Sequence, residues 1–592
     1  MEMINSRSIT LIFLLILFCF CTQIIGLASD TPEITFYQGV PLSPNIQPVI
    51  YITGSDYEMG YQWYQQLLQV FGPWILTTNH IGSEFFWQGH DFGEEELAAL
   101  KAYQMYIKQY APEMIDIFKG MADGATDAGI PLTYTEVLAQ WTAAEVFPSP
   151  PSESAQEVLP PEDHCSGFAA WGSATRDGKT ICGTSVDDSG QFDITIVALP
   201  KEGGNNFIFT PFHPAGGQAP PWRPKLGAPA LNDKGLVYIR EADVTSVTEE
   251  ERTYGLPAGI SDLHTIRFAN NAQEALDMIL SWPSSDGLAA GFWADIHGDS
   301  FVIESREKPE VIRRAGDIGE EDFLFFTNNA LSPLASEFDG GGTMYVKHGG
   351  WAGPGTQGFS NVSRNLQLWN MLNYYHGNVN LEFAKMMYRF SGDPHPGSPV
   401  LDLSLGSATA DDYSVFETAD LKKNIGGLHN ANVYAILPEA QEYYVCKGHP
   451  GREAYPPVTS GFYYTDALHT FFQLKLAPSI PEITKAAQTQ ASYELIRADR
   501  ELTKLTYLDP AFAPLKEIFN KAATERRRGE YYQSLARATE GNDAVCNWGK
   551  ALRGFTSSQA YAQDVYEALV PPPATPEDLF LKPWGYWVET IR

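Results

Sequence analysis

Cys165 is the residue of this sequence whose surroundings most clearly suggest catalytic chemistry. It follows residues 147–164, a stretch rich in proline, serine and acidic side chains. It opens a run, CSGFAAWGSA, that is typical of a strand, and a turn at Asp177–Gly178 leads into a second run that ends in Asp187. A cysteine at a free N-terminus has its own base, because the α-amine titrates near neutral pH and can accept the thiol proton. The pattern predicts an N-terminal nucleophile, and a buried strand cysteine remains the alternative.

Other catalytic chemistries fit the sequence less well. The twelve histidines contain no H-E-x-x-H pair, so His395, His429 and His449 are interpreted as loop residues, and their convergence on a metal is left open. The G-x-G-x-x-G match at 353–358 neither follows a β-branched strand nor opens a βαβ unit. There is no G-x-S-x-G elbow, and Cys165 opens a strand whereas a papain-like cysteine opens a helix. We therefore expect no cofactor and no metal.

Helices and then short strands are predicted to position Cys165 and Asp187. Ser55 is the expected N-cap of a first helix, and a helical stretch over 94–129 is expected to break near Pro112. Further strands are predicted at 194–199, 206–212, 236–241, 293–305, 322–327 and 431–446, and further helices at 271–282, 363–375 and 478–540. Many short strands with helices between them predict an α+β protein with antiparallel sheets.

Composition limits the classes of partner. The chain has 592 residues, 44% of them hydrophobic, which is enough for several domain-sized cores. Forty Lys+Arg against 72 Asp+Glu give a net charge of −32. Nucleic acid and anionic membrane surfaces are therefore not expected as partners, because both are negatively charged.

The first 28 residues are predicted to be a secretory signal peptide. Arg7 supplies the positive charge, residues 11–21 are apolar, and Gly26 and Ala28 fit a cut before Ser29. The alternative is an uncleaved anchor, although the apolar run is short for a membrane-spanning helix. We expect a secreted or extracytoplasmic protein with no stable membrane association once this segment is removed.

Four cysteines remain after the predicted signal: Cys165, Cys182, Cys446 and Cys546. Four in so long a chain do not form a disulfide scaffold, and none belongs to a C-x-x-C pair. Cys182 is expected to be buried in a strand. Cys446 and Cys546 are expected to pair if the C-terminal residues fold back on the sheet.

Several motifs follow one another in the order known from one enzyme family. They are the run from Cys165 to Asp187, the segments 54–62, 124–130, 231–236 and 294–304, the pair Thr327–Asn328, and the segment 360–364. Together they resemble the acyl-CoA:6-aminopenicillanate acyltransferase-like family of N-terminal-nucleophile hydrolases, which is distantly similar to choloylglycine hydrolases and penicillin V acylases. The resemblance covers about residues 35–455.

The resemblance implies a four-layer αββα sandwich of two antiparallel sheets. It also implies self-cleavage between His164 and Cys165, after which the two fragments remain associated. The expected organisation is a helical N-terminal chain at 29–164 with an activation linker at 147–164, a catalytic domain at 165–470 and a helical C-terminal extension at 471–592.

The same resemblance assigns roles in the hydrolysis or transfer of a small acyl-amide. Cys165 attacks the acyl carbonyl to give a thioester, and its α-amine acts as base and then acid. Asp187 holds that amine. Asn328, or Asn329 if the register differs, donates to the oxyanion. Arg364 neutralises charge around Asp187 or a substrate carboxylate.

Two departures from the family pattern keep other functions open. The family's arginine before the aspartate is Thr184 here, and no obvious counterpart of the asparagine follows 231–236, where Arg240, Glu241 and Asp243 stand. One alternative is therefore a catalytically inactive extracellular binding or structural protein of the same fold. A phospholipase B-like hydrolase with the same nucleophile is the other.

Overall fold

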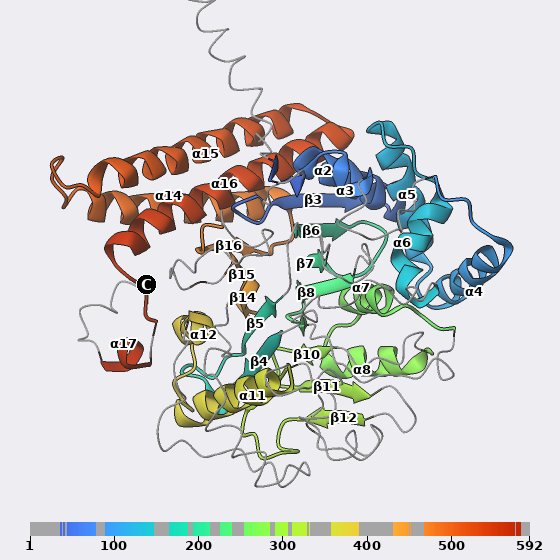
Figure 1. Ribbon diagram of the computed structural model, residues 1–592, viewed down its shortest axis with the longest axis horizontal. Coiled ribbons are helices and arrows are strands. Elements are labelled where there is room, and N and C mark those ends of the chain that lie inside the picture. The colour runs from blue at the N-terminus through green and yellow to red at the C-terminus, as the bar shows by residue number, and fades with distance from the viewer. Residues whose placement is uncertain are drawn as a thin grey trace, which may run out of the picture. The chain divides into compact units, whose positions relative to one another are not determined.

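Two β-sheets that face each other form the centre of the computed structural model (Figure 1). The structure describes residues 36–37, 40–41, 44–77, 89–146, 165–187, 193–212, 225–239, 254–283, 291–305, 311–327, 331, 357–389, 430–448, 450, 467–574 and 576–581. Residues 43–592 form one unit, and residues 1–42 form another in which β1 (Phe36–Tyr37) pairs with β2 (Val40–Pro41). The predicted signal peptide and the predicted linker at 147–164 lie outside the described residues.

The larger sheet has eight described strands in the order β12-β11-β10-β9-β8-β7-β6-β3. Their bounds are β3 (Val49–Gly54), β6 (Thr195–Pro200), β7 (Phe207–Phe212), β8 (Lys225–Asn232), β9 (Val237–Ile239), β10 (Phe292–Ala294), β11 (Ser300–Ser305) and β12 (Val311–Arg314). Seven of the strands pair antiparallel, as expected. The expectation of a purely antiparallel sheet is wrong at one edge, because β3 pairs parallel with β6 from Val49↔Thr195 to Gly54↔Pro200.

The smaller sheet is antiparallel throughout its six described strands, in the order β13-β4-β5-β14-β15-β16. The strands are β4 (Ser166–Ala170), β5 (Ile181–Asp187), β13 (Phe323–Phe326), β14 (Asn430–Leu437), β15 (Glu442–Lys447) and β16 (Phe471–Lys475). The predicted hairpin around Asp177–Gly178 is confirmed, with Ser166 opposite Ser185 and Ala170 opposite Ile181. A short helical turn, η1 (Gly172–Ala174), precedes its tip.

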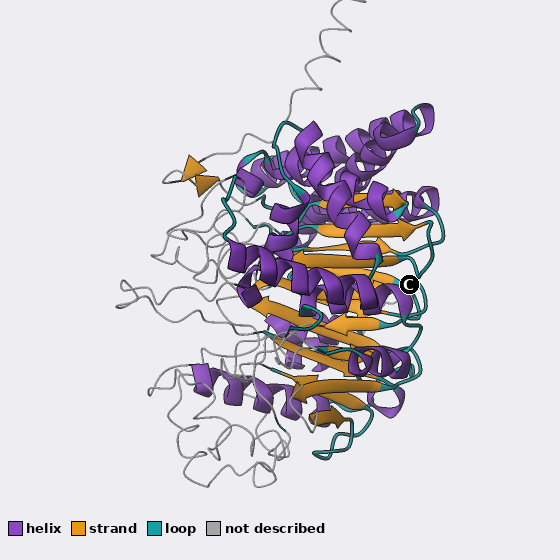
Figure 2. Ribbon diagram, turned by 90° about the vertical axis from the view of Figure 1, so that its right-hand side faces the viewer, coloured by secondary structure: helices purple, strands orange, loops and turns teal. Residues whose placement is uncertain are grey.

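Alternating side chains divide the protein into four layers. Along β3, Val49 and Tyr51 face the core between the sheets, whereas Ile50 and Ile52 face the helices outside. The period of two places successive side chains on opposite faces of a strand, so each sheet can bury both of its faces. Figure 2 shows the strands lying side by side with helices packed across them. The predicted α+β sandwich of two sheets with a helical C-terminal region is confirmed at this level.

Helices from the first half of the chain cover the larger sheet. They are α2 (Asp56–Phe71), α3 (Trp74–Thr77), α4 (Glu94–Tyr110), α5 (Glu113–Asp127), α6 (Tyr134–Val146), α7 (Ala258–Phe268) and α8 (Ala272–Ser281). Ser55 caps α2 as predicted, with its side chain accepting from the main-chain N–H of Glu58. Glycine allows α2 and α5 to touch, because a Cβ on Gly60 would lie 1.9 Å from the carbonyl oxygen of Ile117.

On the opposite side, α11 (Gln357–Tyr374), α12 (Leu381–Arg389) and α17 (Pro576–Leu581) pack on the outer face of the smaller sheet. The core they share with this face includes Phe168, Phe325 and Val433. These helices complete the fourth layer.

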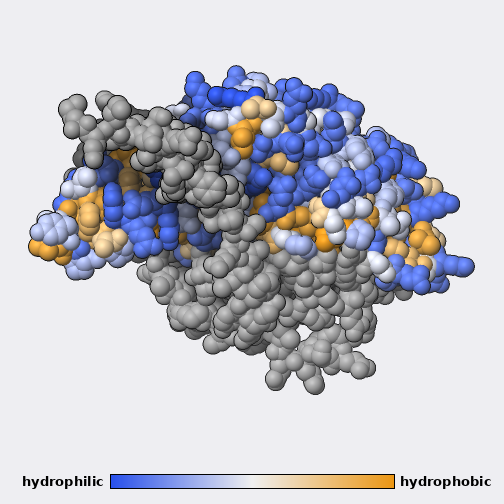
Figure 3. Space-filling model, turned by 90° about the horizontal axis from the view of Figure 1, so that it is seen from above, coloured by the Kyte–Doolittle hydropathy of each residue, from blue (hydrophilic) through white to orange (hydrophobic). Residues whose placement is uncertain are grey.

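Three C-terminal helices close one side of the sandwich: α14 (Ile480–Leu502), α15 (Phe512–Ala538) and α16 (Gly541–Leu569). α16 contacts both β3 and β16, the edge strands of the two sheets. Arg553 of α16 donates to the carbonyl of Val49 at 3.2 Å, and Trp548 and Phe555 enter the core between the sheets. The residues drawn in colour in Figure 3 are mostly hydrophilic, with hydrophobic residues in separate patches. In the described part of the chain, no helix combines the length and the apolar character needed to cross a membrane.

Candidate active site

Cys165 lies immediately before β4, an interior strand of the smaller sheet. Its side chain is 8% exposed and belongs to the core between the two sheets, together with Ala169 and Cys182. Phe168 and Ala170, which flank Ala169 along β4, point to the other face of the smaller sheet, into the core that it shares with α11, α12 and α17 (the outer core). The fold therefore directs this thiol into the space between the sheets, as the strand pattern required.

Two side chains from the outer helices hold the main chain at Cys165. Arg364 of α11, which is 1% exposed, donates through Nη1 to the carbonyl oxygen of Cys165. Tyr388 of α12 donates through its hydroxyl to the carbonyl oxygen of Ser166 at 3.2 Å. The pairing of β13 with β4 stops at Gly167, so these side chains act just beyond the end of that pairing. These two hydrogen bonds fix the main chain at Cys165 and Ser166, and therefore the point from which the Cys165 thiol extends.

Asp187 is the last residue of β5, opposite Asn430 of β14. The pairing shifts between Asn430 and Asn432, which is a β-bulge or irregularity, and bulges redirect nearby side chains. The side chain of Asp187 lies outside the described residues, so its predicted contact with the Cys165 amine remains a prediction.

Thr184 occupies the place where the family resemblance expects an arginine. It is buried, pairs with Gly167 of β4 and Tyr434 of β14, and donates through Oγ1 to the carbonyl of Ser185 at 3.3 Å. A threonine at this position brings no cationic group into the space between the sheets. Any compensation for the buried charge of a thiolate must come from other residues.

Asn328, Asn329 and His164 lie outside the described residues, but the chain on either side of the two asparagines is well fixed. Thr327 donates through Oγ1 to Asn365 Oδ1 at 3.0 Å, and Asn365 is the neighbour of Arg364 on α11. The main-chain N–H of Leu331 donates to Glu304 at 3.0 Å. The residue preceding Asn328 is thereby tied to the helix that also holds Cys165.

Glu304, the last residue of the 294–304 motif, takes part in a buried charge network. Arg313 pairs with Glu304 at 2.7 Å and also with Glu320, and all three side chains are fully buried. The guanidinium also donates to the carbonyl of Phe325 in β13. Burial raises the pKa of Glu320, against the charge of Arg313, which lowers it. This network joins β11 and β12 to the end of β13, from which the chain continues to Asn328.

A buried polar cluster between the sheets was not predicted from the sequence. Its members are Gln47, Asp193, Thr195, Thr210, Asn432, Tyr434 and Tyr443. Asn432, which faces Val186 of β5, donates to the carboxylate of Asp193. Burial raises the pKa of Tyr434 and Tyr443 far above the ordinary value, and the nearby Asp193 acts in the same direction. Their hydroxyls therefore stay protonated and can donate hydrogen bonds. Only the spatial fold brings these residues together.

The expected disulfide between Cys446 and Cys546 is wrong. All four cysteines of the described residues are thiols, and Cys446 lies in the outer core whereas Cys546 lies on α16 beside Gln69. Cys182 is buried, as predicted. Burial raises the pKa of Cys182, Cys446 and Cys546, so these thiols resist ionisation.

Comparison with known proteins finds limited similarity. No family model matches the sequence. An uncharacterized protein of Archaeoglobus fulgidus is 30% identical over 146 residues, which cover 23% of this chain and 24% of that protein. The chain therefore matches about a quarter of that relative's length. Among solved structures, a mutant of the conjugated bile acid hydrolase from Clostridium perfringens is similar with 12% identity, covering 53% of this chain and 98% of that chain. The TM-score of 0.27 indicates a distant likeness and does not establish a common fold.

Proposed function

We propose that this protein is the precursor of an N-terminal-cysteine amide hydrolase or acyltransferase, which acts on a small acyl-amide. The observation that supports this most is the position of Cys165. It lies one residue before an interior strand, with its side chain between two stacked sheets and its carbonyl held by Arg364. The buried guanidinium satisfies this carbonyl and places a positive charge next to the proposed cleavage site.

The proposed maturation is a cleavage of the chain by its own thiol. The sulfur of Cys165 attacks the carbonyl carbon of His164, and the peptide nitrogen leaves as the α-amine of Cys165. Water then hydrolyses the thioester, which releases the carboxylate of His164 and regenerates the thiol. The hydrogen bonds from Arg364 and Tyr388 keep the following peptide units in place while this bond breaks.

The proposed catalytic cycle uses the same thiol after maturation. The α-amine accepts the thiol proton, the sulfur attacks the substrate's acyl carbon, and the amine product leaves with that proton. Water or an acceptor amine then resolves the thioester. Asp187 would hold the protonated α-amine, and Asn328 would stabilise the oxyanion. Secretion, with the two fragments staying together after the cut, belongs to the same proposal.

Intact-mass measurement of the purified protein tests maturation. Wild type is expected to yield two fragments divided between His164 and Cys165, and Cys165→Ala is expected to remain uncut. Cys546→Ala is the matched control, because it removes a buried thiol on α16 and should leave cleavage unchanged. A folded wild type that stays intact would overturn the proposal. Release of primary amine from acyl-amides of graded chain length then identifies the substrate class.

Thr184 favours a second candidate, a binding protein that keeps this fold without turnover. Its buried side chain leaves no cationic group at a position where the related enzymes have one. A protein that cleaves itself but releases no amine from any acyl-amide, while still binding them, would support this candidate over the enzyme.

A further inference from the structure

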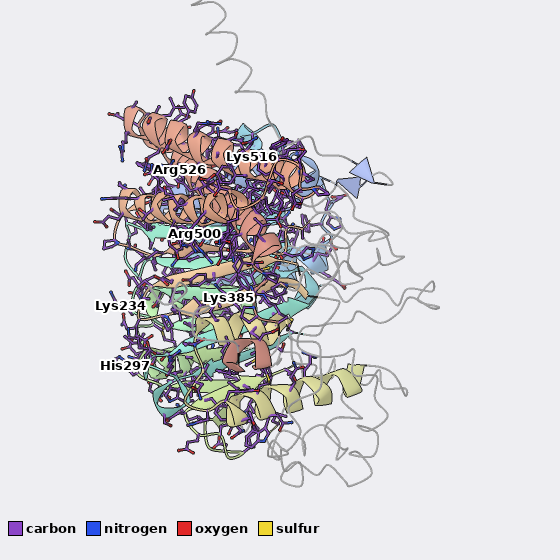
Figure 4. The ribbon with its side chains drawn as sticks, turned by 90° about the vertical axis from the view of Figure 1, so that its left-hand side faces the viewer. Lys234, His297, Lys385, Arg500, Lys516 and Arg526 are labelled. Carbon is purple, nitrogen blue, oxygen red and sulfur yellow. The ribbon has the colours of Figure 1, made fainter. Side chains whose placement is uncertain are left out.

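A cavity of about 400 Å³ lies at the β16 edge of the smaller sheet, where Phe472 of the core between the sheets also lines it. Helix α12, strands β15 and β16, and helices α14 and α16 form its walls. Phe471 lines it and belongs to the outer core, whereas Cys165 belongs to the core between the sheets. Small-molecule sites in proteins are typically about 300–1,000 Å³, so this cavity has the size of a binding site. Figure 4 labels Lys385, on the α12 wall, below Arg500 of α14 and Arg526 of α15.

One wall presents two cations one helical turn apart. Lys385 and Arg389 lie at i and i+4 on α12, and their exposed fractions are 8% and 4%. The ammonium of Lys385 lies over the rings of Tyr444 and Phe471, and its hydrogen bond to Glu382 is long, at 3.3 Å. Arg389 donates through Nε to the carbonyl of Pro450 at 3.2 Å, and its Nη2 lies 3.7 Å from the carboxylate of Glu567. Its Nη1 has no hydrogen-bond partner among the described residues. Two buried cations therefore retain donor capacity, and buried donors normally find partners.

The facing wall presents carboxylates whose positions are fixed by neighbouring side chains. Gln490 and Arg497 hold the two oxygens of Glu494 on α14, at 2.8 and 2.9 Å. Gln563 holds Glu567 on α16 at 2.7 Å. Both carboxylates are buried, at 5% and 4% exposure. Such pairs keep acceptor oxygens at defined points of the wall.

The charges in the cavity nearly balance. The cationic side chains that line it are Lys385, Arg389 and Arg497, and the acidic ones are Glu382, Glu442, Glu494 and Glu567. An anion placed here would lie close to four carboxylates, and a cation would lie close to three cationic groups. A neutral ligand avoids both costs. Charged donors and charged acceptors both line the cavity, and a hydroxyl group can both donate and accept.

We propose that this cavity binds a neutral polyhydroxylated ligand of the size of a mono- or disaccharide. Lys385 and Arg389 donate to hydroxyl oxygens of the ligand, and the carboxylates and glutamines accept from hydroxyl protons. Tyr493 lines the cavity and is 38% exposed, and the guanidinium of Arg497 lies over its ring at 5.4 Å from the centroid. In the proposed complex, the opposite ring face packs against the C–H face of a sugar. This proposal does not depend on the reaction at Cys165.

Calorimetric titration of the full-length protein tests the proposal. The neutral probes are glucose, galactose, mannose, N-acetylglucosamine, maltose, lactose and myo-inositol, and the charged comparators are glucuronate and glucosamine. At least one neutral probe is expected to bind with millimolar or tighter affinity and more tightly than either comparator. Lys385→Met is expected to weaken that binding by about tenfold, which is the scale of one lost hydrogen bond to a charged group. Tyr493→Ala is also expected to weaken it by about tenfold, because it removes the ring that packs against the sugar.

Matched controls separate loss of the ligand contact from loss of folding. Lys521→Met and Tyr531→Ala, both on α15, change the same residue types outside the cavity lining and should bind as wild type does. Tyr493 is partly exposed, so its variant should keep the wild-type melting temperature even if Lys385→Met does not. The proposal is overturned if no neutral probe binds, if a charged comparator binds more tightly, or if Tyr493→Ala binds as wild type.

Discussion

The guanidinium of Arg364 donates to the carbonyl oxygen of Cys165, a residue 199 positions earlier in the chain. The family resemblance assigned Arg364 to charge neutralisation near Asp187 or the substrate. The structure shows it on the main chain of the candidate nucleophile, and its contact with Asp187 stays a prediction because that side chain lies outside the described residues. A buried arginine can orient a peptide unit and supply positive charge nearby, so both roles can belong to one side chain.

Arg364→Met is expected to slow self-cleavage at His164–Cys165 by at least about tenfold, because it removes a charge-assisted hydrogen bond beside the reacting peptide. Arg364→Lys keeps a donor and should retain part of the rate. Time-resolved intact-mass measurement gives both rates, and thermal unfolding reports whether each variant is folded. A folded Arg364→Met protein that matures at the wild-type rate would restrict Arg364 to a packing role.

Asp187→Asn is expected to lower turnover of an acyl-amide by at least about tenfold, in line with general acid–base contributions of 10²–10⁴. Asp188→Asn should be close to neutral, because neighbouring strand residues point to opposite faces. The measurement is the rate of amine release from matured protein. Equal losses in both variants, or a loss only at Asp188, would place the functional carboxylate elsewhere.

Cys182 and Cys446 are expected to resist alkylation by iodoacetamide in the native protein at pH 8. Burial raises the pKa of both thiols, so they stay protonated where an ordinary cysteine begins to ionise, and only the thiolate reacts rapidly. Peptide mapping after alkylation measures this, and protein unfolded in denaturant is the control in which all four remaining cysteines should react. Early modification of Cys182 in folded protein would contradict its place in the core.

Gly183→Ala is expected to destabilise the protein by about 1–3 kcal/mol through overpacking. A Cβ at this position would lie 2.5 Å from Cε1 of Phe168 and 3.1 Å from Cε2 of Tyr388, whose hydroxyl holds Ser166. Denaturant unfolding gives the difference in free energy. Gly93→Ala is the control, because its nearest neighbour would be 3.7 Å away, and its cost should stay below about 1 kcal/mol. Equal costs would mean that the rings around Gly183 adjust freely.

Local sequence signals predicted the elements around Cys165 well. The Ser55 cap, the break near Pro112 and the hairpin from Cys165 to Asp187 depend on neighbouring residues, and the structure confirms all three. The short edge strand β16 and the helix α12 were missed. Glu382, Lys385 and Arg389 recur at helical spacing around an apolar face, so the sequence did carry a signal for α12. The segment is only nine residues long, which made that signal easy to overlook.

Long-range relationships could not be predicted from local patterns. The parallel pairing of β3 with β6 joins Val49 to Thr195, and the polar cluster between the sheets joins Gln47 to Tyr434. No periodicity in one segment encodes a partner so far along the chain. The same holds for Arg364, whose contact with Cys165 depends on where α11 packs.

The contact of α16 with β3 has a consequence for how the chain folds. Asn45 donates to the hydroxyl of Tyr561, and Gln62 donates to Asn542, so partners 516 and 480 positions apart must meet. Contacts between such distant positions slow folding, because a long loop must close before they form. Ribosomes add about 5–20 residues per second, so β3 waits tens of seconds for α16 to be made. During that interval α16 does not yet cover β3, which is an edge strand of the larger sheet. The nascent chain therefore needs protection from pairing through β3 with other chains.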